Sequence, residues 1–187
     1  MGIRDRWIAS LNRVATGVKA TRNLLTPLGL LIFGVFTSLF VLAAIAIDRL
    51  LDLPHLLPAD AGLVSGILVI VVGVAVTAWS AGSFLKARGT PVPFNPPPVL
   101  VAGGPYRVVR NPMVTGVTLI LLGIGLAIRS VSLVVVFTPL YLMLNVWELA
   151  QIEEPELIRR FGDTYLIYRD HTPMFIPGLK RGTNTDP

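Results

Sequence analysis

Residues 28–47, LGLLIFGVFTSLFVLAAIAI, form a stretch of twenty residues without a charged side chain. An α-helix rises about 1.5 Å per residue, so about 20 apolar residues cross the roughly 30 Å hydrocarbon core of a bilayer. The stretch therefore predicts a transmembrane helix. It places the chain among all-α integral membrane proteins.

Three more apolar segments follow, at 61–85, 112–128 and 131–150. The last two are separated only by a short polar turn at 129–130, which predicts a helical hairpin. The segment 112–128 is close to the lower length limit for a span. We expect about four transmembrane helices in a single membrane domain that covers residues 1–187.

The composition agrees with a membrane protein. The chain is 53% hydrophobic and 14% charged, and its mean hydropathy is +0.69, whereas soluble domains carry about 25% charged residues. There is no cysteine, which excludes disulfides and thiolate metal sites. The two histidines, His55 and His171, lack a ligand-like spacing, so we expect no metal.

The basic residues follow a membrane topology. Of the 16 Lys and Arg residues, 14 lie in the segments 1–27, 86–113 and 148–187, which alternate with segments that hold one each. The positive-inside rule therefore predicts that these three segments, and with them both termini, are cytoplasmic. This distribution explains the net charge of +5 without a nucleic-acid partner.

The two ends of the chain are expected to lie outside the spans. Residues 1–26 interleave apolar and basic side chains at roughly helical spacing, which is typical of an interfacial helix on anionic membrane lipids. Residues 180–187, KRGTNTDP, are expected to form a disordered tail.

The predicted cytoplasmic loop 86–111 is rich in proline and leads into GGPYRVVRNPMVTG, residues 103–116. Its proline density excludes a helix and favours a stiff, extended path, so a rigid linker is one interpretation and a functional loop is another. Asn111 and Pro112 have the side chains preferred at the N-cap and first position of a helix. Arg107 and Arg110 would then lie at the membrane edge, where basic side chains also contact headgroups without further function.

A second motif, residues 153–177, follows the fourth apolar segment. Leu157, Phe161, Tyr165 and Tyr168 recur at spacings of four, four and three, which predicts a cytoplasmic amphipathic helix. Glu153 and Glu154 precede it, and because adjacent residues point about 100° apart on a helix, we expect at most one to face the bundle. A solvated acidic pair remains the alternative.

Together, the two motifs resemble a family of integral-membrane methyltransferases that includes isoprenylcysteine carboxyl methyltransferase and the phospholipid N-methyltransferases. The family pattern is G-x-Y-x-x-x-R-[HN]-P-x-Y-x-G and, after a helical hairpin, E-E-x-x-L-x-x-x-F-G-x-x-Y-x-x-Y with a prolyl tail. The matching residues are Gly104, Tyr106, Arg110, Asn111, Pro112, Gly116, Glu153, Glu154, Leu157, Phe161, Gly162, Tyr165, Tyr168, Pro173 and Pro177. Two positions differ from many members, with Asn111 in place of histidine and Val114 in place of tyrosine.

The resemblance implies that S-adenosylmethionine binds on the cytoplasmic side and that a lipophilic acceptor enters from the bilayer. The implied catalytic residues are Arg110, Asn111 and Glu154. The implied donor-binding residues are Gly104, Tyr106, Arg110, Pro112, Met113, Gly116, Glu153, Glu154, Tyr165 and Tyr168. The acceptor is either an isoprenoid or prenylcysteine carboxylate, which an arginine would orient, or a lipid headgroup with an amine or hydroxyl, which requires a base.

Two other functions are compatible with parts of the sequence. Membrane sterol reductases carry a similar arginine, [HN]-P and tyrosine pattern but bind NAD(P)H, and they have more spans and a larger basic surface. A non-enzymatic membrane scaffold would use the proline-rich loop to bind a partner. The ordered pair of motifs argues against the scaffold.

Overall fold

The computed structural model describes residues 19–90 and 96–178, with the backbone alone for residues 19–26. The predicted interfacial segment up to residue 18, residues 91–95 of the proline-rich loop, and the predicted tail at 180–187 lie outside the described residues.

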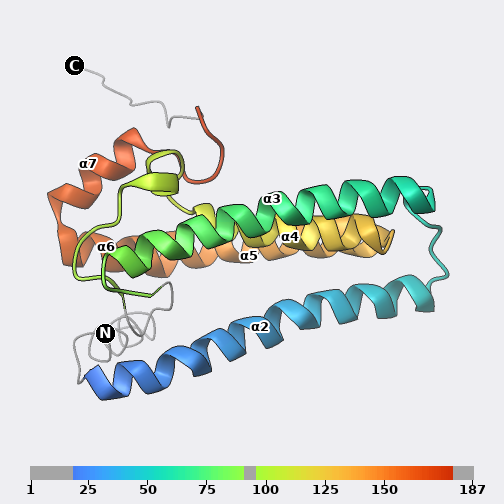
Figure 1. Ribbon diagram of the computed structural model, residues 1–187, viewed down its shortest axis with the longest axis horizontal. Helices are drawn as coiled ribbons and strands as arrows, with labels where there is room; N and C mark the ends of the chain where they lie inside the picture. Colours follow the sequence, from blue (N-terminus) through green and yellow to red (C-terminus); the bar gives the residue numbers. More distant parts are fainter. Residues whose placement is uncertain (1–18, 91–95, 179–187) are drawn as a thin grey trace.

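The described residues form helices and no strands, as Figure 1 shows. The helices are α2 (Lys19–Leu50), α3 (Ala59–Lys86), η1 (Gly104–Arg107), α4 (Pro112–Ala127), η2 (Leu133–Phe137), α5 (Thr138–Glu148), η3 (Leu149–Glu153), α6 (Glu154–Phe161) and α7 (Asp163–His171). Of these, η2 through α6 form one continuous helix, Leu133–Phe161. The predicted all-α fold is confirmed.

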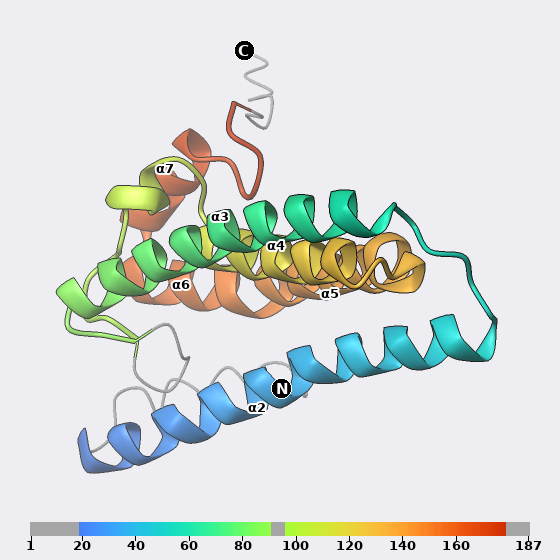
Figure 2. The same ribbon diagram turned by 45° about the vertical axis from the view of Figure 1, so that its right-hand side comes forward.

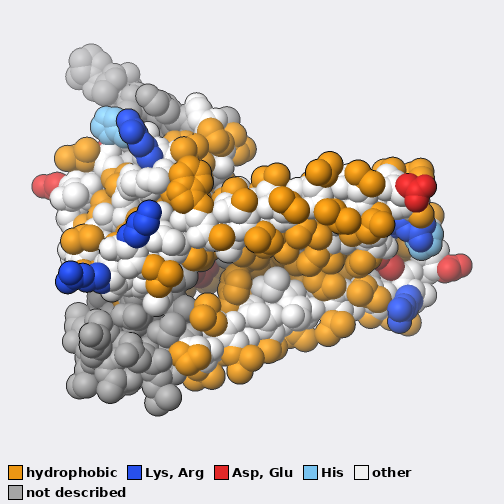
Figure 3. Space-filling view, viewed as in Figure 1, with side chains coloured by type: hydrophobic (Ala, Val, Ile, Leu, Met, Phe, Trp, Pro, Cys, Tyr) orange, Lys and Arg blue, Asp and Glu red, His pale blue; other side chains and the backbone are white. Residues whose placement is uncertain are grey.

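Three helices in the described part of the chain are long and apolar enough to cross a membrane, namely Pro27–Leu50, Ala59–Lys86 and Leu133–Phe161. The fourth predicted span, α4, is a shorter apolar helix of 16 residues. Hydrophobic side chains cover the middle of the molecule, and charged side chains gather at its two ends (Figure 3). This distribution is typical of a protein that is embedded in a bilayer.

The continuous helix Leu133–Phe161 is longer than the predicted span 131–150. It contains two wide π-helical turns, η2 and η3, and a proline is the second residue of the helix that follows each of them, Pro139 in α5 and Pro155 in α6. A proline inside a helix has no N–H to donate, and its ring clashes with the carbonyl four residues earlier. The wide turns relieve this clash and let the helix continue.

The predicted C-terminal amphipathic helix is two helices, α6 and α7, because the chain bends at Gly162. Gly162 has φ +54°, a conformation that glycine adopts without the steric penalty that a side chain would cause. The bend turns α7 back over the end of the bundle (Figures 1 and 2).

Helices α3 and α4 pack closely along glycine residues. A Cβ atom added at Gly66 would lie 2.6 Å from the Gly123 carbonyl oxygen, and one added at Gly123 would lie 2.8 Å from the Gly66 carbonyl oxygen. Such short separations leave no room for a side chain and are typical of helix pairs in membranes. The closely packed α3 and α4 helices support the segment that contains η1 and precedes α4.

Helix α2 contacts the rest of the bundle mainly at the end that lies far from α6 and α7. Phe40 packs edge-on against Tyr141, with ring centroids 5.8 Å apart. At the far end, the Asp48 carboxylate contacts the Ser130 hydroxyl and accepts a hydrogen bond of 3.0 Å from the Ser132 N–H. Toward α6 the helix separates from the others in both ribbon views (Figures 1 and 2).

Candidate active site

Backbone hydrogen bonds join the two sequence motifs. The Arg110 N–H donates to the Pro173 carbonyl oxygen at 2.8 Å, and the Asn111 N–H donates to the Met174 carbonyl oxygen at 3.2 Å. These residues lie more than 60 positions apart in the chain, so the helical hairpin between them brings both motifs to one end of the bundle.

The first motif turns at Gly104, which has φ +61° and begins η1. This turn buries Tyr106, which is 6% exposed, with its ring edge against Phe84 at a centroid distance of 5.3 Å. The Tyr168 hydroxyl of α7 donates to the Tyr106 carbonyl oxygen at 2.6 Å. The short helix η1 is therefore held between α3 and α7.

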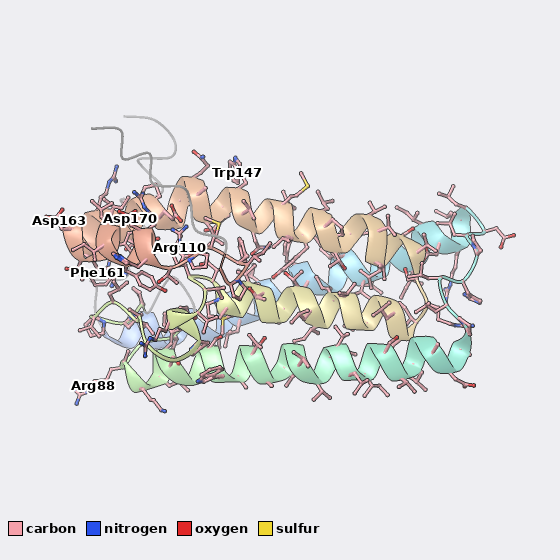
Figure 4. All side chains as sticks on the ribbon, turned by 90° about the horizontal axis from the view of Figure 1, so that it is seen from above. Arg88, Arg110, Trp147, Phe161, Asp163 and Asp170 are labelled. Carbon is pink, nitrogen blue, oxygen red and sulfur yellow. The ribbon has the colours of Figure 1, made fainter. Side chains whose placement is uncertain are left out.

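Arg110 and Glu154 form an ion pair, and their side chains are only 8% and 13% exposed. The Arg110 Nε has no hydrogen-bond partner in the described structure. Figure 4 shows Arg110 inside the molecule beside α6, whereas Trp147 and Arg88 project outward. A buried guanidinium retains a strong demand for acceptors, so the Nε is an unsatisfied donor of a residue that lines the cavity.

A cavity of about 380 Å³ opens beside this ion pair. It is lined by side chains from both motifs, from α3, α5 and the proline-rich loop, and from Phe33 of α2. Among the residues that the sequence predicts for the site, the cavity wall includes Tyr106, Arg110, Asn111, Glu153, Tyr165 and Tyr168. A cavity of this size is in the range of small-molecule binding sites.

The other predicted site residues are not part of the cavity wall. Glu154 contacts Arg110, which does line the cavity, whereas Glu153 lines the cavity itself. Pro112 is fully buried, Met113 is partly buried, and Gly116 lies against Gly73 of α3. Gly104 shapes the turn, where an added Cβ would lie 3.1 Å from the Ser83 hydroxyl.

Asn111 lies at the start of α4, and Pro112 occupies the first turn, as predicted. The Asn111 side chain makes no capping hydrogen bond. The backbone carbonyl oxygen of Asn111 accepts a hydrogen bond from the Thr115 N–H at 3.1 Å. Asn111 is one of the residues that line the cavity. The side chain is therefore available to a ligand.

Three tyrosines of the site remain protonated in ordinary conditions. Burial is the main cause that raises the pKa of Tyr165 to about 12, and Glu154 adds to the effect while Arg110 opposes it. Burial also raises the pKa of Tyr106 and of Tyr168. Neutral phenols present hydrogen-bond donors and electron-rich ring faces, and such faces attract cations.

Sequence reasoning missed several residues of the cavity wall, namely Phe33, Phe84, Asn145, Glu148, Glu156 and Arg160. Asn145 and Glu148 could have been recognised in the sequence, because polar side chains are rare in a membrane span and are usually functional there. Glu156 pairs with Arg160 at 3.3 Å, and Arg160 donates to the Pro97 carbonyl oxygen at 2.8 Å. This contact ties α6 to the proline-rich loop.

The cavity wall thus combines two arginines, several aromatic side chains and three glutamates. The described residues include no group of His, Cys, Asp and Glu that could hold a metal ion. Such a site suits an organic ligand that carries both an anionic group and a cationic centre.

The family model for phospholipid methyltransferases matches residues 61–164, which is more than half of the chain. The match runs from α3 to the start of α7 and includes Arg110 and Glu154. No curated protein and no solved structure matches the chain. The chain therefore belongs to the phospholipid methyltransferase family, a family of membrane enzymes that transfer methyl groups to lipid-like acceptors.

Proposed function

We propose that the protein transfers a methyl group from S-adenosylmethionine to the amine of a phospholipid headgroup at the cytoplasmic membrane face. The observation that carries this proposal is the Arg110–Glu154 pair, which is buried beside a cavity with the Arg110 Nε left without a partner among the described residues. The family supplies the reaction class, and the cavity supplies the residues for both reactants.

The residues of the cavity fit the donor. The Arg110 Nε is a free charge-assisted hydrogen-bond donor for the methionine carboxylate. The Asn111 amide, which caps no backbone N–H, is available to the ribose hydroxyls. Tyr165 and Tyr168 offer ring faces for the sulfonium, with ring centroids 6.1 Å apart.

The acidic wall favours an amine as acceptor. Glu148, Glu153 and Glu156 all line the cavity, and Glu156 alone of these three has an ion-pair partner among the described residues. A carboxylate acceptor would be repelled by these side chains, whereas an ammonium would be attracted. An ammonium must lose a proton before it can accept a methyl group, and we assign this proton to Glu153, which lines the cavity.

Bound in the cavity, S-adenosylmethionine supplies an activated methyl group, so that an N–C bond forms, the S–C bond breaks, and S-adenosylhomocysteine leaves. The chain itself contributes position and charge. Tyr106 and Phe84 pack edge to face and form an apolar part of the cavity wall, and Phe33 of α2 adds a further aromatic side chain to that wall. Correct placement of two reactants alone is worth effective molarities of about 10⁵ M or more.

A nicotinamide dinucleotide phosphate fits the cavity less well. The described basic residues in the cavity wall are Arg110 and Arg160, and each is already paired with a glutamate. The unpaired Arg110 Nε is one donor for an anionic group, whereas the dinucleotide carries three phosphate groups. The observation disfavours the reductase alternative.

Calorimetric titration of the detergent-purified protein tests the proposal. S-adenosylhomocysteine should bind with one site per chain, and NADPH should give no binding heat. Binding of NADPH without binding of S-adenosylhomocysteine would contradict the methyltransferase proposal. Binding of neither ligand would favour a non-enzymatic scaffold.

A further inference from the structure

Glu148 is an acidic side chain inside a helix that is long enough to cross a membrane, Leu133–Phe161. It lines the cavity together with Phe33 of α2, and it is also exposed. Figure 3 shows the surface hollowed between α2 and the other helices. A carboxylate at such a place is costly in lipid, so it marks a path for a polar group.

The wide turn η3 aligns Glu148 with Glu153. Residues five apart on an ordinary α-helix point about 140° away from each other, because each residue turns the helix by about 100°. In η3 the Glu154 N–H donates to the Leu149 carbonyl oxygen, five residues earlier, and this wider winding brings Glu148 and Glu153 toward one face. Both side chains then line the same cavity.

Glu148, like Glu153, differs from the two paired glutamates near the site. Glu154 is paired with Arg110, and Glu156 is paired with Arg160. No ion pair of Glu148 occurs among residues 27–90 and 96–178, whose side chains the structure describes. A structural role would require such a partner, since an unpaired charge in a membrane helix destabilises the fold.

A second, independent feature marks this cavity as a ligand site. The Arg110 side chain is more than nine-tenths buried in its wall, and its Nε lacks a partner within the described structure. This unpaired donor suits an anionic group of a ligand. Glu148 ends α5, before η3, whereas Glu154 follows η3, and the Glu148 carboxylate suits a cationic group.

We propose that Glu148 binds the cationic nitrogen of the acceptor headgroup at the bilayer side of the cavity and thereby selects amine lipids over neutral ones. The proposal rests on the proposed function, because it assigns a residue to acceptor selection in that same site. Glu148 holds the ammonium by charge and hydrogen bonding, and Glu153 lies one helical turn further on toward the donor residues. Asn145, one turn earlier, lines the same wall and adds a neutral hydrogen-bonding group.

Binding of two short-chain phospholipids tests the proposal. They differ only in their headgroup, which is aminoethyl in one and hydroxyethyl in the other. Each is titrated calorimetrically into detergent-purified protein that is saturated with S-adenosylhomocysteine, so that no transfer occurs. The wild type should prefer the aminoethyl lipid by about tenfold or more, the usual effect of a hydrogen bond to a charged group.

Glu148→Gln should lose this preference while its affinity for S-adenosylhomocysteine stays unchanged, and Glu148→Asp should retain most of it. Asp163→Asn makes the same change of charge on an exposed residue outside the cavity wall and should behave as the wild type. A full preference in Glu148→Gln would overturn the role of Glu148 and leave the proposed function standing. A wild type that shows no preference for the amine would overturn both.

Discussion

Arg110 takes part in three of the contacts that form the site. Its backbone N–H bonds to the Pro173 carbonyl oxygen, its guanidinium contacts Glu154, and its side chain lines the cavity. Removing one partner of a buried ion pair leaves the other charge uncompensated, which is more costly than losing a surface pair. Arg110 therefore serves both the local fold and the proposed donor site.

At the residue scale, Glu154→Gln and Arg110→Lys should each weaken binding of S-adenosylhomocysteine by about tenfold or more. The first variant removes the charge that pairs with Arg110, and the second replaces the planar guanidinium with an ammonium of different geometry. Calorimetric titration measures the affinity, and far-ultraviolet circular dichroism checks that the helices persist. Arg107→Lys is the matched control, since Arg107 is exposed on η1 outside the cavity wall. Unchanged affinity in both test variants would remove the pair from the site.

A second residue-scale prediction concerns alkaline pH. Folding raises the pKa of the Tyr165 phenol from 10.0 to about 12, chiefly by burial. A raised pKa contributes stability that is present below the unfolded value and is lost as the pH rises through the folded value. The thermal stability of the detergent-solubilised protein should therefore fall between pH 10 and about 12, through loss of roughly 2–3 kcal/mol at this group.

Tyr165→Phe should flatten that fall, because phenylalanine cannot ionise. A melting temperature measured across this pH range distinguishes the two proteins. An identical alkaline fall in the variant would show that the phenol is not buried as the structure has it.

At the element scale, the α3–α4 contact depends on glycine. Gly66→Leu should lower the thermal stability markedly, because an added Cβ would already lie within 2.6 Å of backbone atoms of α4. Gly82→Ala, on the same helix, is the control, since nothing lies within 4 Å of a Cβ added there. That change should leave the stability equal or raise it by up to about 1 kcal/mol. Equal melting temperatures of Gly66→Leu and the wild type would contradict the close packing.

The wide turn η3 gives the second element-scale prediction. Deleting Ala150 removes the extra residue of this turn and rotates Glu148 by about 100° relative to the glutamates of α6. Binding of S-adenosylhomocysteine should survive, because the backbone hydrogen bonds from Arg110 and Asn111 to Pro173 and Met174 hold the segment after the turn next to Arg110. The preference for the aminoethyl lipid should disappear. The substitution Ala150→Ser keeps the register and should retain that preference. If the deletion variant kept the full preference for the aminoethyl lipid, η3 would not be needed to align Glu148 with Glu153.

At the scale of the whole molecule, the distribution of basic residues predicts one orientation. The chain has no cysteine, so single cysteines can be introduced without a background. A cysteine at position 88 and one at position 163 should react with an impermeant maleimide from the cytoplasmic side, and one at position 52 should react from the opposite side. Reaction of positions 52 and 88 from the same side would contradict the topology.

The sequence predicted much of the architecture, because uncharged runs of about 20 residues leave few alternatives to a membrane helix. The start of α4 at Pro112 also followed from local chemistry. The break at Gly162 was missed because the apolar spacing continues across it, although glycine itself was the signal. The extension through η3 depends on how the helix accommodates Pro155, which hydrophobic periodicity does not encode.

The candidate site was predictable where polar residues lie in a motif and was missed where they lie in an apolar run. Arg110 and Glu154 stood in the two motifs, and the structure places them in contact. Asn145 and Glu148 lie in the fourth apolar segment, and only the fold shows that they line the cavity. A cavity that α2, α5 and the proline-rich loop form together arises from tertiary packing.

Methyl transfer in proteoliposomes tests directly whether the protein methylates amine lipids. The wild type, supplied with S-adenosylmethionine labelled on its methyl group, should transfer label to lipids with an aminoethyl headgroup and not to lipids with a hydroxyethyl headgroup. The variant Glu154→Gln should transfer less in the same vesicles. Label in the hydroxyethyl lipid, or no label in any lipid despite bound donor, would contradict the account.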